Sequence, residues 1–328
     1  MGGVALAHIL KRGAGALLGG TVKRTAPVVV LLLMIAVVGI WNPAFFQGSN
    51  LITVLTLASL LLMASLGQTW VILLGSIDLS VGYMASMCSV IFALLVSDWG
   101  YGALLLIVLI GIAGGLLNGL VYTMLRIPSF IATLGTGGIF LSLAYVISNA
   151  STVAVADVGN PVMRLLGREF LYVPVSIGLT VLLWAAMLAY QNFTPCGKKL
   201  YYIGTSEPAA WLSGIRINRH KILAFTVSGM TAALTGVLLV STIYNGSPNL
   251  GDPYTLKSIA VVVMGGTALT GGVGGLGRTM IGALIMAILS NGMNVVGVNA
   301  YFQNIVTGAV IVLAAMLSLD RSKIPMLK

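Results

Sequence analysis

Long apolar stretches, separated by short polar segments, run through the whole chain. A transmembrane helix needs about 20 mainly apolar residues to cross roughly 30 Å of hydrocarbon. Stretches of about that length occur ten times, at about 26–45, 51–74, 79–97, 102–125, 129–148, 172–190, 222–244, 257–276, 279–297 and 299–319. The pattern predicts an all-α fold, a polytopic transmembrane helical bundle of about ten spans.

One long polar segment, residues 191–221, interrupts this pattern. It contains five of the 17 basic residues, namely Lys198, Lys199, Arg216, Arg219 and Lys221. Lysine and arginine gather in the cytoplasmic loops of membrane proteins, so this segment is predicted to be cytoplasmic.

The other basic residues set the orientation of the spans. With the N-terminus inside, the alternation of ten spans places 14 of the 17 basic residues in the cytoplasm and leaves Arg164, Arg168 and Lys257 outside. The first apolar stretch is full-length and lacks a small-residue cleavage site, which predicts an uncleaved span. We expect both termini in the cytoplasm, with a cytoplasmic N-terminal segment 1–25, a single transmembrane domain 26–320 that includes the loop 191–221, and a cytoplasmic tail 321–328.

Composition excludes a soluble globule, because 58% of residues are hydrophobic, 7% are charged and the mean hydropathy is +1.05. The basic residues behind the net charge of +10 are scattered over short loops. This distribution is better explained by the orientation of the spans in the membrane than by binding of an anionic ligand. Cys88 lies in a predicted span and Cys196 in the cytoplasmic loop, so no disulfide framework is expected. His8 and His220 form no cluster with cysteines or carboxylates that would suit a metal.

The cytoplasmic loop contains one short helix with a signal at each end. Ser206 is a suitable N-cap and Gly214 a suitable C-terminal stop, so a helix is predicted over 207–213. A helix of that length is ~10 Å long and too short to be stable alone. Either another protein holds it, or it lies on the membrane surface with Trp211 in the interfacial aromatic belt.

Two spans have unusual glycine patterns. Gly111, Gly115 and Gly119 recur at four-residue spacing, which predicts close packing against a neighbouring helix. The segment 263–277 holds seven glycines, each of which weakens a helix by roughly 1 kcal/mol relative to alanine. We therefore expect a break, bulge or re-entrant turn there, which at membrane depth must be covered by protein or line a water-filled cavity. A weak similarity between 71–82 and 261–272 suggests related breaks in two halves of the chain.

Asp78 is the one acidic residue inside the predicted apolar core. An ionised aspartate at the bilayer centre costs at least ~2.5 kcal/mol, so Asp78 must lie at an interface, find a partner or line water. Asp78 or Ser80 is a suitable N-cap for the third span. A role of Asp78 in a pathway or gate is the second interpretation, and the two are compatible.

The run GTSEPAAWLSGI at 204–215 resembles the coupling loop of ABC-importer permeases, and most closely that of the ribose/xylose/autoinducer-type sugar permeases. The segments 76–82, 118–119, 126–136 and 265–275 are similar to further signatures of that family, so the resemblance covers about 50–320. Two positions depart from the family pattern. Trp211 stands where arginine is usual, and Ser206 where asparagine is frequent.

This resemblance implies the permease subunit of an ATP-driven importer in the bacterial inner membrane. It implies as partners a second permease chain, identical or homologous, ABC ATPase subunits inside and a substrate-binding protein outside. The chain has no G-x-x-x-x-G-K-[ST] motif, so ATP and Mg²⁺ are expected on the ATPase, with no cofactor in this chain and no enzymatic activity of its own. Coupling to the ATPase is implied for Gly204, Ser206, Glu207, Ala209, Ala210, Trp211, Ser213 and Gly214.

The substrate class implied is a small carbohydrate, such as a pentose, hexose or sugar alcohol, moved by alternating access. The polar residues that could line its path are neutral apart from Asp78, namely Asp78, Ser80, Asn118, Thr133, Thr136, Asn291 and Asn294. One alternative is a branched-chain amino-acid permease, whose substrate carries both charges. Another is an ion-coupled secondary transporter, which needs intramembrane carboxylates, of which this chain offers one at most.

Overall fold

The computed structural model describes residues 25–170 and 173–318, and in these the chain is almost entirely helical. A helix Thr25–Trp41 and a 3-10 turn η1 (Pro43–Phe46) come first. The helices that follow are α2 (Gly48–Leu73), α3 (Val81–Trp99), α4 (Tyr101–Leu125), α5 (Ser129–Ile147), α6 (Pro161–Gly167), α7 (Val175–Phe193), α8 (Pro195–Thr205), α9 (Glu207–Leu212), α10 (Ile217–Ile243), α11 (Asp252–Met264), α12 (Leu276–Val295) and α13 (Ala300–Ser318).

Every predicted span contains a helix, but not all of these helices are long and apolar enough to cross a membrane. Within the described residues, seven meet that criterion: α2, α3, α4, α5, α7, α10 and α12. The helix Thr25–Trp41, the 13-residue α11 and α13 occupy the other three predicted spans. The protein is therefore a helical multi-pass membrane protein. The predicted cytoplasmic N-terminal segment and tail fall almost entirely outside the described residues.

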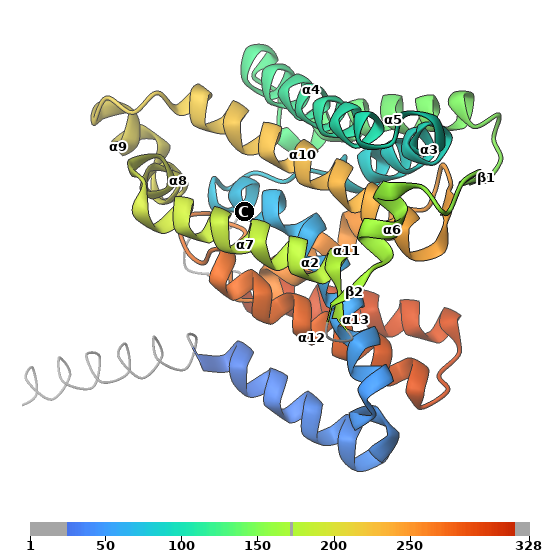
Figure 1. Cartoon of the computed structure of the whole chain (residues 1–328). Coiled ribbons are helices and arrows are strands. Elements are labelled where there is room, and N and C mark those ends of the chain that lie inside the picture. Colours follow the sequence, from blue (N-terminus) through green and yellow to red (C-terminus); the bar gives the residue numbers. More distant parts are fainter. Residues whose placement is uncertain (1–24, 171–172, 319–328) are drawn as a thin grey trace, which may run out of the picture.

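The second half of α2 lies at the centre of the bundle and is covered by other helices (Figure 1). Every residue from 58 to 73 is buried, so the second half of this helix has no lipid-facing side. A helix that is apolar all round belongs in the core of such a protein. α10 packs against α2, α3 and α4, which makes α2 and α10 the frame to which the shorter segments attach.

The three glycines of α4 that recur at four-residue spacing pack against α10, as predicted. A side chain at Gly111 would collide with the backbone at Gly229, one at Gly115 with Phe225, and one at Gly119 with Ile222. The missing side chains let the two helix backbones approach closely over more than two turns.

Two small ribbons add to the helices. β1 (Val153–Ala154) pairs antiparallel with β4 (Asn245–Gly246), which joins the segment after α5 to the segment after α10. β2 (Glu169–Phe170) pairs antiparallel with β3 (Val173–Pro174) before α7. The all-α prediction therefore holds for the main elements, with these short pairings as the exception.

Candidate functional site

Two breaks interrupt the helices at the centre of the protein. The first is the segment 74–80 between α2 and α3, and the second is the glycine-rich segment 265–275 between α11 and α12. The predicted break in the eighth span is thereby confirmed. α11 ends after 13 residues, a length of ~20 Å that is too short to cross the hydrocarbon. Five glycines of the second break have positive φ, a conformation that other residues adopt only with strain.

The two breaks touch each other. The backbone N–H of Gly272 donates a hydrogen bond to the carbonyl oxygen of Leu73, at 2.9 Å. Gly75, which has φ +72°, lies against the backbone carbonyl of Thr270. The two segments that share a weak sequence similarity are therefore both breaks, and they meet in space.

Asp78 lies in the first break and is fully buried. Its Oδ1 accepts hydrogen bonds from the backbone N–H and the hydroxyl of Ser80, at 2.9 and 2.7 Å. Its Oδ2 accepts one from the hydroxyl of Ser228 on α10, at 2.7 Å. The Ser80 side chain makes no cap hydrogen bond with α3, so the cap prediction is wrong for Ser80. It is supported for Asp78, whose Oδ1 accepts the N–H of Ser80 two residues on, at the start of α3.

Ser80 continues this network into α4 and α5. Its hydroxyl oxygen accepts a hydrogen bond from Asn118 Nδ2 at 2.7 Å, and Thr136 donates to Asn118 Oδ1. Thr133 accepts a bond from the backbone N–H of Leu79 at 2.9 Å. Five of the predicted pathway residues therefore lie together around the first break. In this arrangement their hydrogen-bond donors and acceptors are paired with one another. A solute could bind to them only by replacing some of these hydrogen bonds.

The other two predicted pathway residues lie elsewhere. Asn291 Nδ2 donates to Asn50 Oδ1 at 3.0 Å, and Asn294 Oδ1 accepts from Gln303 Nε2 at 2.7 Å. Both sit in the last two turns of α12, far along that helix from the second break. The structure does not bring them to Asp78, because their position along α12 decides which residues they contact. Their polarity alone does not.

The loop 191–221 contains a helix that the sequence prediction missed. Thr194 is the N-cap of α8, and its hydroxyl accepts a hydrogen bond from the N–H of Gly197 at 3.1 Å, with Pro195 in the first turn. The cap, the proline and the buried pair Leu200 and Ile203 are signals from which this helix was predictable. The missed helix matters because it lies against both breaks.

Gly204, near the end of α8, lies against the place where the two breaks touch each other. A side chain there would collide with the carbonyl of Leu73 and the N–H of Gly272. Three segments far apart in the sequence therefore cross through backbone atoms alone. We refer to Leu73, Gly204 and Gly272 as the backbone crossing.

Side-chain bonds reinforce the backbone crossing. Trp70 Nε1 donates to Gln191 Oε1 at 3.2 Å, and Gln191 Nε2 donates to the hydroxyl of Tyr201 at 2.8 Å. Tyr201 donates in turn to the carbonyl of Gly274 at 3.0 Å. Burial raises the pKa of Tyr201, so the phenol keeps the proton that this last bond needs. The sequence prediction missed these residues, because their role depends on tertiary contacts.

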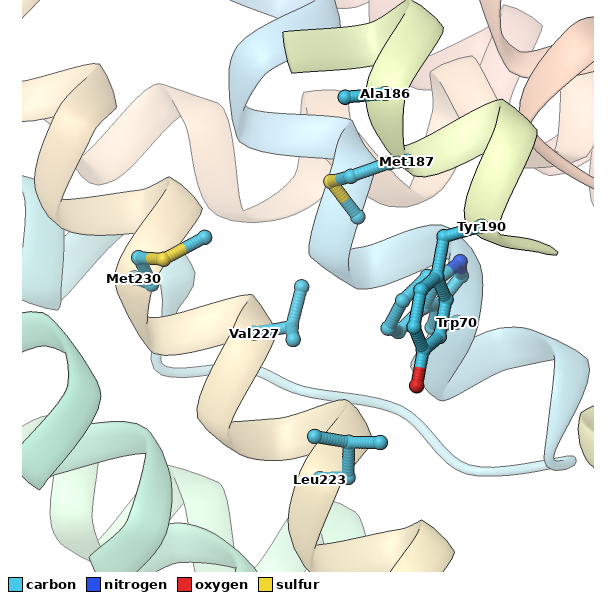
Figure 2. A pocket seen from close by; sticks show the side chains of 7 residues that line it. All are labelled: Trp70, Ala186, Met187, Tyr190, Leu223, Val227 and Met230. Carbon is cyan, nitrogen blue, oxygen red and sulfur yellow. The ribbon is translucent and has the colours of Figure 1, made fainter. Parts of the chain in front are cut away.

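An apolar cavity of about 330 Å³ lies between α2, α7 and α10 (Figure 2). Trp70 stacks on Tyr190 along one side of it, with ring centroids 5.5 Å apart. Its lining consists of Trp70, Ala186, Met187, Tyr190, Leu223, Val227 and Met230. Such a lining suits hydrocarbon and offers little to a solute with many hydroxyl groups.

α9 agrees closely with the short helix predicted over 207–213. The Ser206 hydroxyl accepts a bond from the N–H of Ala209 at 3.4 Å, and Gly214 ends the helix with φ +76°. Ala210 is buried, whereas Trp211 is 69% exposed. Figure 1 shows α8 and α9 together at one edge of the molecule, beside the start of α10.

The residues predicted to couple the chain to an ATPase occupy both short helices and the turn between them. Gly204 belongs to α8, and Ser206 is the cap of α9. The members within or just after α9 are Glu207, Ala209, Ala210, Trp211, Ser213 and Gly214. Leu212, beside Trp211, is 78% exposed, so α9 presents a large apolar surface that a partner or the membrane surface must cover.

Comparison with known proteins identifies relatives over nearly the whole chain. The family model described as branched-chain amino acid transport system / permease component matches residues 50–315. The ribose import permease protein RbsC of Bacillus subtilis (strain 168) is 36% identical over 310 residues, covering 93% of this chain and 94% of the relative. RbsC of Escherichia coli (strain K12) is 34% identical, covering 88% and 91%. The D-allose transport system permease protein AlsC of Escherichia coli (strain K12) is 29% identical, covering 89% and 90%. No solved structure matches the chain.

Proposed function

Because the chain belongs to the family of transport-system permease components that it matches over residues 50–315, we propose that it is the membrane subunit of an ATP-driven ABC importer for a small carbohydrate. The observation that carries this proposal is the 29–36% identity, over about nine tenths of the chain, to permeases named for ribose and allose. The substrate would be a neutral pentose, hexose or sugar alcohol.

The buried polar groups support a neutral substrate. Among the described residues, Asp78 is the only charged side chain that is buried. A branched-chain amino acid carries both charges and would need groups of both signs in its path, although the family description mentions that substrate class. An ion-coupled carrier would need more intramembrane carboxylates than this one.

Partner subunits complete the proposed importer in the bacterial inner membrane. α9, with its exposed Trp211, would dock on an ABC ATPase that binds ATP and Mg²⁺. A second permease chain, identical or homologous, and an external substrate-binding protein are the remaining partners. The topology would have ten spans with both termini in the cytoplasm, which the distribution of basic residues supports.

Reconstitution into liposomes with the ATPase and the binding protein tests the substrate. We expect ATP-dependent uptake of radiolabelled ribose or a related sugar, and none of leucine. Uptake driven by a proton or sodium gradient without ATP would overturn the importer mechanism. ATP-dependent uptake of leucine alone would replace the carbohydrate with the amino-acid alternative. The solute retained by the purified binding protein gives an independent check.

A further inference from the structure

Lys221, in the second turn of α10, has a side chain that is only 12% exposed. Its Nζ lies 2.6 Å from Oε1 of Glu207, the first residue of α9. An ion pair between fully exposed side chains contributes little to stability. Where one member is shielded from water, removal of its partner costs much more free energy, because a shielded charge is left unpaired. This contact therefore fixes α9 to the start of α10.

Lys221 also contacts a residue of α4. Its Nζ lies 4.8 Å from the ring centroid of Tyr122, a cation–π geometry. Tyr122 packs in turn on Phe225, one turn beyond Lys221, with ring centroids 5.5 Å apart. The ammonium group thus has one partner on α9 and another on α4. If it moves with one partner, its contact with the other is strained.

Tyr122 reaches from Lys221 to the first break. Its hydroxyl accepts a hydrogen bond from the hydroxyl of Ser76 at 3.1 Å. Ser76 is buried and lies two residues before Asp78, which is bonded to Ser228 on α10. An unbroken series of side-chain contacts therefore runs from α9 to the segment that contains the buried carboxylate.

We propose that Lys221 and Tyr122 are positioning residues that convey movement of α9 to the 74–80 segment, through the series Glu207, Lys221, Tyr122 and Ser76, which we call the ion-pair relay. This proposal rests on the proposed function, since it requires that an ATPase moves α9. When α9 shifts, Lys221 either carries Tyr122 with it or loses both contacts. Tyr122 then shifts or releases Ser76, which changes the position of the Asp78 network. The signal would travel through packed and bonded groups, one physical route by which distant sites are coupled.

Two variants interrupt the ion-pair relay at different points. Lys221→Met keeps the aliphatic stem and removes both charge contacts. Tyr122→Phe keeps the ring beside the ammonium group and removes the hydroxyl, which bonds to Ser76 and also interacts with Lys221. Lys198→Met is the matched control, because Lys198 is an exposed lysine of the same loop with no part in the relay. Each variant is reconstituted with the ATPase and the loaded binding protein, and solute uptake per ATP hydrolysed is measured.

We expect both relay variants to keep their ATPase and to reach the membrane at normal levels, because the exposed apolar side chains of α9 stay in place and neither change adds a polar group to a span. Uptake per ATP should fall about fivefold or more, the size of a typical coupling between sites. Lys198→Met should match the unmodified chain. A purely structural role would lower the amount of assembled complex and leave this ratio unchanged.

The double variant Lys221→Met/Tyr122→Phe should lower uptake per ATP no further than the stronger single variant does, because both changes interrupt the same series of contacts. Unchanged uptake per ATP in both single variants would overturn the relay, as would losses that multiply in the double variant. If Lys221→Met fails to assemble, Tyr122→Phe, which deletes a single oxygen atom, decides the outcome. Should Trp211→Ala retain both ATPase and transport, the proposed coupling function fails, and the relay fails with it.

Discussion

Asp78 illustrates how much a single residue can depend on its neighbours. Its carboxylate is fully buried, yet it accepts three hydrogen bonds from Ser80 and Ser228. Bonds to a charged group are worth roughly 1.5–3 kcal/mol each, which offsets part of the cost of burial. The residue therefore ties α10 to the break between α2 and α3, and any change at Asp78 acts on both.

Replacement of Asp78 by asparagine should impair transport more than assembly. The substituted amide would keep the size of the side chain but turn one acceptor oxygen into a donor that faces a serine hydroxyl. We expect uptake to fall about tenfold or more, the equivalent of one such bond, with a normal amount of protein in the membrane. Asp98→Asn, at an exposed aspartate, is the control. Normal uptake by Asp78→Asn would contradict a role for this residue in the path.

Gly204 leaves no room for a side chain, because backbone atoms of two other segments lie against it. In Gly204→Ala the new methyl group would collide with the Leu73 carbonyl, and such overpacking costs ~1–3 kcal/mol. Gly178→Ala is the matched control, because Gly178 also lies in a helix but has open space around its Cα. Thermal unfolding followed by size-exclusion chromatography should show a lower midpoint for Gly204→Ala alone. Equal midpoints for the two variants would show that the backbone crossing is looser than described.

At the scale of elements, helix ends were predictable where local signals decide them. Ser206 and Gly214 mark α9 in the sequence, and the structure ends the helix within one residue of the prediction. The glycine-rich break was predictable for the same reason. α8 was missed although its cap and proline mark its start in the sequence, whereas its position against Leu73 and Gly272 depends on segments that lie far away in the chain. Likewise, Asn291 and Asn294 were grouped with Asp78 by polarity, since the sequence does not tell which helices are neighbours.

α9 should be needed for retention of the ATPase. Trp211→Ala removes the largest exposed apolar side chain of α9, and loss of such an anchor often costs more than 2 kcal/mol of binding. Gly214→Val should misdirect the chain into α10, because valine does not tolerate φ +76°. Both variants should insert in the membrane but co-purify with less ATPase and lose substrate-stimulated ATP hydrolysis. Trp99→Ala, an exposed tryptophan at the far end of α3, is the control.

Full retention of the ATPase and normal transport by both α9 variants would contradict the coupling role. Trp211 would then be better explained as a member of the interfacial aromatic belt, the alternative left open by the sequence.

At the scale of the whole molecule, the path of the chain through the membrane is the main prediction. Reporter fusions at Ser97, Asn160 and Asn249 should give an outside signal, and fusions at Arg126 and Lys198 an inside signal. The physical reason is that the ten-span arrangement would place 14 of the 17 basic residues on the cytoplasmic side. Two or more reversed signals would refute the ten-span arrangement, whereas one reversed signal near α11 would point to a different path for that short helix.

The backbone crossing has a consequence for how proteins of this kind diversify. Leu73, Gly204 and Gly272 meet through main-chain atoms, so the identity of surrounding side chains hardly enters their contact. Under the proposed function the polar residues around Asp78 line the solute path, and substitutions there would leave this contact in place. Permeases with new substrate preferences would then still respond to the same ATPase, provided that position 204 stays a glycine.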